Sequence, residues 1–442
     1  MKYEIGAQTV TAVYDNAGTQ NPLIEALPEE LEPDTFFRHI RSFPSPPAVR
    51  SYAERKRALA LIPAVFVPLD YLYGVYDGLF RMLQSSYHTL TSKESVQRIN
   101  AIFASDGAAG AYGTQAQSGA LLGTPGLGKT TGVKRCLRLM PQVIAHEKYL
   151  GNTFYTKQVL WLFVECPSDA SQKTMAYNII RALDMAVGGN HLDYIQHTRS
   201  TATSTVATYI KVLCMTYHVG LLVIDEIQNV VSTAQRTNRV KPLIRFLTEL
   251  TNDTCTAVYF VGTSLADNVF QSEEYLRRRT RGPRLLPFKP DAAYRDFLRQ
   301  LWPYQFTAAQ AELTDKLANQ LYDYSGGIPA YIARLFEEAQ AQALTMGMDK
   351  IDGKLIAHAA DYLAIQPPRE LGRGAFISDF RQSDADIAIE PEVGEPTRRL
   401  YAVKRGRKAA ERDEADLIAA YKAGTLTEML RSHNLLEVLV LC

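Results

Sequence analysis

Short apolar runs alternate with segments of helical periodicity between residues 118 and 288. The apolar runs are Ser118–Leu122, Val159–Val164, Gly220–Ile224 and Ala257–Val261. Continuous apolar runs of this length are typical of strands buried on both faces of a parallel sheet. Helices are expected from Lys129 and over Gln172–Ala186, Thr201–Tyr217 and Lys241–Asn252. The alternation predicts an α/β fold in which helices cover a parallel sheet.

The flanking regions have different patterns. The N-terminal part contains proline clusters and a helical segment at Tyr71–Ser86, whereas the residues after 290 are helical throughout until Pro367. The final part is charged and irregular, with a basic run at Lys404–Arg412 and an amphipathic pattern over Asp413–Val440. We therefore expect an N-terminal extension with an arm (1–95), an α/β domain (96–289), a helical lid (290–366) and a charged tail (367–442).

Composition narrows the class of protein. Apolar residues make up 46% and charged residues 21% of the chain, as in ordinary globular proteins. The formal net charge of +1 argues against a free-standing, high-affinity DNA binder, but allows cations gathered on one face or binding after assembly. The five cysteines are scattered without a CxxC pair, and no signal-peptide or membrane-spanning pattern is evident. These features predict a cytoplasmic protein without a membrane partner.

A glycine-rich loop follows the first predicted strand and matches G-x-x-x-x-G-K-[ST]. In such a loop the backbone N–H groups surround phosphate oxygens, a lysine neutralises the β- and γ-phosphates, and a hydroxyl binds Mg²⁺. The alternative is a chance match, which the strand before the loop and the helix after it disfavour. The predicted ATP site comprises Gly123, Thr124, Pro125, Gly126, Leu127, Gly128, Lys129, Thr130 and the adjoining Thr131.

Two carboxylates end the third apolar run. Asp225 is expected to bind Mg²⁺ together with Thr130, and Glu226 is expected to orient and deprotonate the attacking water. An acidic helix cap after a buried strand is the alternative, but the preceding phosphate loop favours catalysis. Thr263 ends the next strand and is predicted to contact the γ-phosphate or the water, although a plain turn hydroxyl fits nearly as well.

Several further segments resemble a known family. The segments are Asn21–Pro28 (NPLIEALP), Pro141–His146, Cys166 with Asn178–Val187, and Gly220–Gln228 (GLLVIDEIQ). Together with the phosphate loop they resemble TnsC, the AAA+ ATPase that regulates bacterial cut-and-paste transposons, over about residues 14–340. The last hundred residues do not share the resemblance.

The resemblance implies a function. Proteins of the TnsC family bind ATP and Mg²⁺, polymerise on duplex DNA, and link a target-selector protein to the transposase, while hydrolysis drives disassembly. A head-to-tail contact between identical subunits forms a ring or an open helical filament. Many weak contacts to the DNA backbone add up along such a filament, so a nearly neutral monomer can hold DNA without reading its sequence.

The resemblance also suggests roles for further residues. A run of arginines lies just after the helix that follows the Ala257–Val261 strand, where AAA+ proteins place an arginine that reaches the neighbouring subunit's nucleotide. A solvated surface or a DNA patch is equally compatible. The arginines of this run are Arg277, Arg278, Arg279 and Arg281. In related ATPases the residue directly after the proline at this point of the lid is often basic and senses nucleotide. Here that residue is Ala330, so Arg334, one helical turn further on, is the candidate sensor.

Two residues are candidates for DNA contact. Lys173 and Thr174 begin a helix in the region that lines the pore of AAA+ rings. An ordinary exposed helix start explains them equally well. We interpret the basic run of the tail as a docking segment for the transposase, with a second DNA patch as the alternative.

Three other functions compete with this prediction. They are a nucleotide-gated adaptor with negligible turnover, another AAA+ DNA-loading ATPase, and a P-loop kinase. Glu226 argues against the adaptor because a nucleotide switch without turnover does not need a base beside the phosphate.

Overall fold

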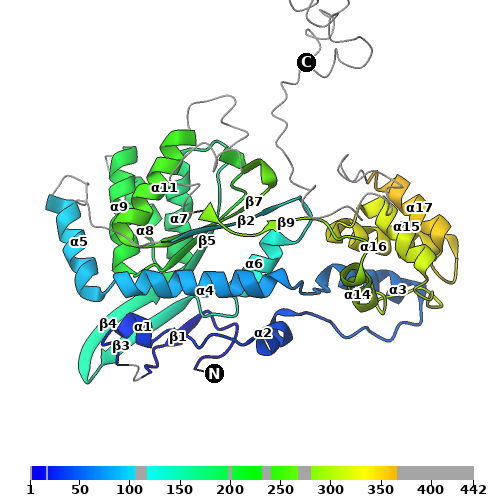
Figure 1. Ribbon diagram of the computed structural model, residues 1–442, viewed down its shortest axis with the longest axis horizontal. Coiled ribbons are helices and arrows are strands. Elements are labelled where there is room, and N and C mark those ends of the chain that lie inside the picture. Colours follow the sequence, from blue (N-terminus) through cyan, green and yellow to red (C-terminus); the bar gives the residue numbers. More distant parts are fainter. Residues whose placement is uncertain are drawn as a thin grey trace, which may run out of the picture. The chain divides into compact units, whose positions relative to one another are not determined.

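The fold is described from a computed structural model of the chain (Figure 1). The structure describes residues 2–15, 18–104, 117–197, 202–230, 240–266 and 280–365. These residues belong to one compact unit, Met1–Ser378. The predicted loop at 106–116 and the tail at 367–442 lie outside the described residues. No helix in the described ranges has the length and apolarity needed to cross a membrane.

A parallel sheet forms the centre of the α/β domain, as the sequence predicts. Its strands lie in the order β5 (Trp161–Glu165), β6 (Leu221–Asp225), β7 (Ala257–Gly262) and β2 (Ser118–Gly123). Two short strands, β8 (Thr280–Arg281) and β9 (Arg284–Leu285), pair in parallel with the other edge of β2. All these pairings are parallel, so the carboxyl ends of the strands meet at one edge.

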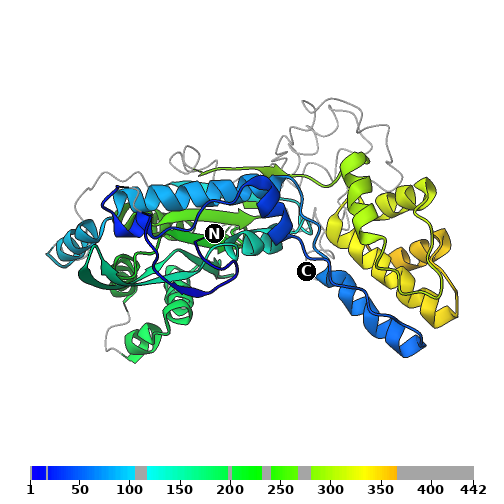
Figure 2. The ribbon, with the colours of Figure 1, turned by 90° about the horizontal axis from the view of Figure 1, so that it is seen from below.

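Side chains alternate between two cores on the faces of this sheet. On β6, Leu222 and Ile224 belong to one core, whereas Leu221 and Val223 belong to the other. The first core also receives α7 (Gln172–Val187), α8 (His191–His197), α9 (Thr203–Thr216) and α11 (Val240–Thr254). The second receives α4 (Tyr71–Thr89) and α6 (Lys129–Leu137). Figure 2 shows α4 lying alongside the sheet, where it contacts β6, β7 and β2. The predicted helices are confirmed as α4, α6, α7, α9 and α11, whereas α8 was not predicted.

The prediction of a single strand over Val159–Val164 is wrong. Val159 ends β4 (Asn152–Val159), which belongs to a second, three-stranded sheet with β1 (Thr9–Thr11) and β3 (Val143–Tyr149). After Leu160, whose N–H donates to the carbonyl of Gln142, the chain enters β5 of the large sheet. Both strands are buried around this switch, so the apolar run continues through it and does not reveal the change of sheet.

The N-terminal part packs closely on the α/β domain. It contains α1 (Pro22–Glu25), α2 (Pro33–Ile40), α3 (Tyr52–Ala58), η1 (Leu59–Ala64) and α5 (Ser92–Ala104) in addition to β1 and α4. Asn21 caps α1 by accepting from Leu23 N at 3.0 Å, and its amide donates to the carbonyl of Tyr87 at 2.8 Å. The buried Glu25 accepts from the Tyr149 hydroxyl at 3.0 Å. The segment Asn21–Pro28 is therefore part of the packed structure.

The helical region near residue 300 has its own core. Its helices are α14 (Ala292–Leu301), α15 (Asp315–Ser325), α16 (Pro329–Met346) and α17 (Gly353–Tyr362). Ala58, Leu59 and Ile62 from α3 and η1 belong to the same core. Arg55 also donates to the carbonyl of Phe306 at 3.2 Å. The N-terminal part therefore contributes to the lid, and the predicted domain boundaries remain a prediction.

Candidate functional site

The glycine-rich loop connects β2 to α6 at the carboxyl edge of the sheet. Gly126 and Gly128 have φ values of +84° and +78°, in the left-handed region that favours glycine. A Cβ on Gly126 would lie 2.8 Å from Ile328 Cγ2, and one on Gly123 would lie 2.4 Å from the carbonyl oxygen of Leu285. Backbone conformation and space therefore both require glycines in this loop.

Lys129 is folded over the loop. Its ammonium donates to the carbonyls of Gly123 at 2.9 Å and Thr124 at 2.8 Å. Burial lowers the pKa of Lys129, whereas the negative charges of Glu226 and Asp225 raise it. Thr130 follows in the first turn of α6, where free backbone N–H groups favour an anion. These groups form a cationic cradle at the end of β2.

The two predicted carboxylates lie at the end of β6. Asp225 is buried, and its Oδ1 accepts from the backbone N–H of Glu226 at 2.9 Å. Glu226 has a φ of +56°, a conformation that costs a non-glycine residue about 1–3 kcal/mol. Strain of this kind concentrates at functional sites because the surrounding structure must hold it.

Thr263 and Gln228 complete this edge. Leu122 on β2 pairs with Gly262 on β7, so Thr263 follows directly beside the start of the loop. The Thr263 N–H donates to Gln228 Oε1 at 3.0 Å, and Gln228 Nε2 donates to Glu226 Oε2. Within the described residues, the buried Thr263 hydroxyl has no hydrogen-bond partner. Gln228 was not predicted as a site residue. Its position, two residues after Glu226 and directly after the apolar Ile227, could have indicated it.

These residues fit a magnesium–nucleotide complex. A buried ammonium and an unpartnered buried hydroxyl are both suited to phosphate oxygens, which accept hydrogen bonds. In the described ranges no group of three or more His, Cys, Asp or Glu side chains could hold a metal. Mg²⁺ commonly uses one or two protein ligands with phosphates and water, so Thr130 and Asp225 suffice as candidates.

The lid contacts the loop through backbone atoms. Ala330 N donates to the carbonyl of Gly126 at 3.2 Å, so α16 begins beside the loop. Arg334 is exposed on α16, about 6 Å further along the helix axis. Its role as a sensor stays a prediction. The predicted arginines Arg277, Arg278 and Arg279 lie outside the described residues, as does the side chain of Arg281.

Lys173 and Thr174 lie in the first turn of α7. Ser171 caps this helix by accepting from Thr174 N at 3.4 Å. The Thr174 hydroxyl donates to Asp169 Oδ2 at 3.3 Å, and Lys173 Nζ lies 5.7 Å from the centre of the Tyr177 ring. A phosphate approaching here would meet the Asp169 carboxylate as well as the lysine, which weakens the attraction. The DNA contact of these two residues stays a prediction.

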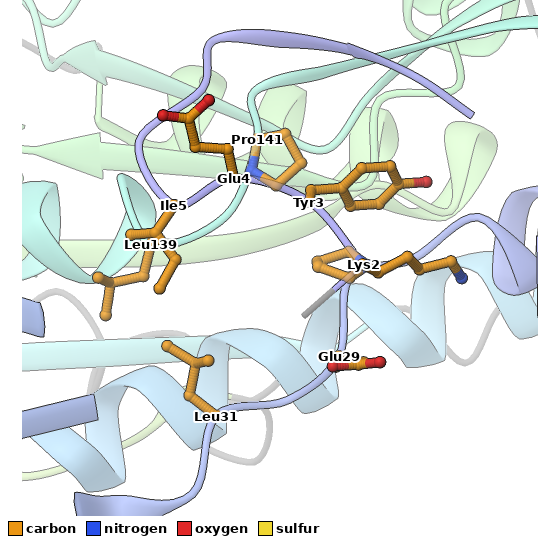
Figure 3. Close-up of a pocket in the computed structure, with 9 residues that line it drawn as sticks. Lys2, Tyr3, Glu4, Ile5, Glu29, Leu31, Leu139 and Pro141 are labelled. Carbon is orange, nitrogen blue, oxygen red and sulfur yellow. The ribbon is translucent and has the colours of Figure 1, made fainter. Parts of the chain in front are cut away.

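A separate hollow lies beside the N-terminal segment, as Figure 3 shows. Leu139 and Pro141, which line it, follow the C-terminal end of α6, whereas the glycine-rich loop precedes the N-terminal end. The residues lining this hollow are Lys2, Tyr3, Glu4, Ile5, Pro28, Glu29, Leu31, Leu139 and Pro141. It is therefore distinct from the candidate nucleotide site.

Several solved structures are similar to this chain. The ORC2 protein of Aeropyrum pernix in ADPNP–ADP complexes is 14% identical over 67% of this chain and 69% of that chain, with a TM-score of 0.39. Drosophila ORC bound to DNA is 11% identical over 78% and 72%, with a TM-score of 0.44. The RuvB branch-migration motor of Thermotoga maritima is 15% identical over 62% and 68%, with a TM-score of 0.33. No match is found among curated proteins.

A family model for an AAA domain matches residues 113–270. This range contains the loop, both carboxylates and Thr263. AAA domains are typical of nucleotide-hydrolysing ATPases. The chain therefore contains an AAA domain in the AAA+ P-loop fold, with a parallel sheet flanked by helices.

Proposed function

We propose that this protein is a Mg²⁺-dependent ATPase that assembles on duplex DNA with ATP and regulates DNA transposition. The observation that carries the ATPase proposal is the convergence of Lys129, Asp225, Glu226 and Thr263 at one edge of the sheet. The transposition role is supported by the resemblance of NPLIEALP and GLLVIDEIQ to the TnsC family.

Each residue at the edge has a role in hydrolysis to ADP and phosphate. The loop N–H groups and Lys129 would hold the β- and γ-phosphates. Bound Mg²⁺, held by Thr130 and Asp225, would supply charge neutralisation. Glu226 would orient a water and take its proton. The Thr263 hydroxyl, which has no partner among the described residues, would donate to the γ-phosphate or to that water.

Assembly follows from a nucleotide placed between subunits. An arginine among Arg277, Arg278, Arg279 and Arg281 would reach the neighbouring subunit's phosphate, and Arg334 would sense nucleotide within its own subunit. Such head-to-tail contacts form a ring or a helical filament. Lys173 and Thr174 would touch the DNA backbone, while a target-selector protein and the transposase bind the assembled form in the cytoplasm.

Imaging of the assembled state tests this function. The full chain is imaged with a slowly hydrolysed ATP analogue, with and without duplex DNA, and phosphate release is measured with ATP. Rings or filaments that need both nucleotide and DNA support the proposal. Single particles under every condition would contradict the assembly model, and absence of phosphate release would contradict the ATPase.

Glu226→Gln separates turnover from assembly. The amide cannot accept the proton of the water, so hydrolysis should fall by about 10²–10⁴-fold while assemblies form and persist. The matched comparison is Lys129→Ala, which should prevent assembly. If wild type and Glu226→Gln turn over ATP equally slowly and both still assemble, the protein is a nucleotide-gated adaptor instead.

A further inference from the structure

We infer that Gln228 is a positioning residue that couples the Glu226 carboxylate to Thr263, so that the base and the phosphate-sensing residue move together. This inference rests on the proposed ATPase function and adds a residue to its site. The inference is based on the Gln228 side-chain amide, which bridges the ends of β6 and β7.

The orientation of this amide follows from its partners. The backbone N–H of Thr263 can only donate, so the Gln228 oxygen must face it, at 3.0 Å. The Gln228 NH₂ group therefore faces Glu226 and donates to its Oε2. The amide therefore fixes the position of one carboxylate oxygen of Glu226.

The surrounding residues provide room and support for the bridge. A Cβ on Gly262 would lie 2.6 Å from Gln228 Oε1 and 2.7 Å from Ile227 Cγ2, so a larger residue there would displace the amide. Ile227 is buried, and its N–H donates to the carbonyl of Val261 at 3.1 Å. The N–H of Asn229 donates to the carbonyl of Glu226 at 2.9 Å. Gln228 is therefore held on both sides of its backbone.

The bridge leaves the reactive atoms of both partners available. Gln228 occupies only Oε2 of Glu226, so the other carboxylate oxygen can accept from a water. It binds only the backbone of Thr263, whose hydroxyl has no partner in the described part of the chain. When that hydroxyl binds a phosphate oxygen, any shift of Thr263 is transmitted through the amide to Glu226. The hydrogen bond also supports the left-handed backbone of Glu226, which has a φ of +56°.

Substitution of Gln228 tests the coupling through steady-state kinetics of the full-length protein. Gln228→Met keeps the side-chain length but removes both hydrogen bonds, so kcat should fall about tenfold or more while KM for ATP changes less than about twofold. Gln8→Ala removes an exposed amide contact on the small sheet and should leave both values unchanged. An unchanged or increased kcat in Gln228→Met would overturn the inference.

Gln228→Glu separates the two halves of the bridge. It retains an acceptor for Thr263 N but has no N–H to donate to Glu226. Its kcat should therefore stay low while KM for ATP changes less than about twofold, as in Gln228→Met. Recovery of the wild-type kcat by Gln228→Glu would contradict the role of the hydrogen bond to Glu226.

The controls separate this inference from the proposed function. Thermal melts establish that each variant is folded, and binding of a fluorescent ATP analogue establishes that the phosphate site is intact. If the wild type hydrolyses ATP and both Gln228 variants match it, the inference fails while the ATPase stands. If the folded wild type binds the analogue but does not hydrolyse ATP, the proposed function fails and the inference fails with it.

Discussion

The glycine-rich loop and the N-terminal hundred residues belong to the same compact unit. They differ in how far apart along the chain their hydrogen-bond partners lie. In the loop, Lys129 bonds to carbonyls five and six positions earlier in the chain. In the N-terminal part, partners lie far away: Asn21 bonds to Tyr87, and Glu25 bonds to Tyr149. A contiguous set of residues forms the loop, whereas distant residues hold the N-terminal part in place.

The two regions meet at α6. Arg135 on this helix donates to the carbonyl of Ile40 at 3.1 Å, and its guanidinium lies 4.3 Å from the Phe66 ring centre. A Cβ on Gly132 would lie 2.5 Å from Leu72 Cδ2. The N-terminal part therefore touches the helix that follows the phosphate loop as well as the lid core. The comparison teaches that the loop is held by contacts within one short segment, whereas the N-terminal part depends on contacts between distant segments. Substitutions in the two regions should therefore separate the proposed chemistry from stability.

The largest effect is expected for Lys129→Ala. It removes the cation of the proposed phosphate site, so ATP turnover should become undetectable and nucleotide should no longer raise the melting temperature. Without nucleotide, the variant should melt close to the wild type, because Lys129 mainly contacts its own loop. Full turnover by the variant would show that the loop is not the catalytic phosphate site.

Ile62→Ala should have the reverse effect. Ile62 is 1% exposed and lies in the lid core, so its truncation should lower the free energy of unfolding by about 2–5 kcal/mol. Chemical denaturation measures this change. Val96→Ala, at a position that is 58% exposed, serves as the matched control and should cost less than about 0.5 kcal/mol. Equal costs at the two positions would contradict the assignment of Ile62 to the lid core.

Acid should weaken the packing around the N-terminal part. Burial, followed by the charge of His146, lowers the pKa of His218 from 6.5 to about 4. The unfolded chain therefore binds this proton more readily, and stability should fall as the pH drops from about 6.5 towards 4, by on the order of 3 kcal/mol. Denaturation at several pH values measures the slope. His218→Gln should flatten it, and an unchanged slope would mean that other groups cause the acid sensitivity.

Asn21→Ala should have the smallest effect, about 1–3 kcal/mol. The substitution removes the cap of α1 and leaves the buried carbonyl of Tyr87 without this donor. Asn21→Ser retains a capping oxygen and should recover part of the loss. Denaturation curves that rank serine no better than alanine would assign the whole effect to the bond with Tyr87.

The glycine-rich loop, the place of Asp225 and Glu226 at the end of a buried strand, and most of the parallel strands could be predicted from the sequence itself. Their requirements are local: glycine conformations, a lysine at a set spacing, and apolar runs long enough for buried strands. The sheet switch at Leu160, the place of Ile62 in the lid core and the bridge from Gln228 to Thr263 were decided by tertiary structure. Each depends on contacts between segments that are distant along the chain, and no local pattern specifies which distant partner will be met.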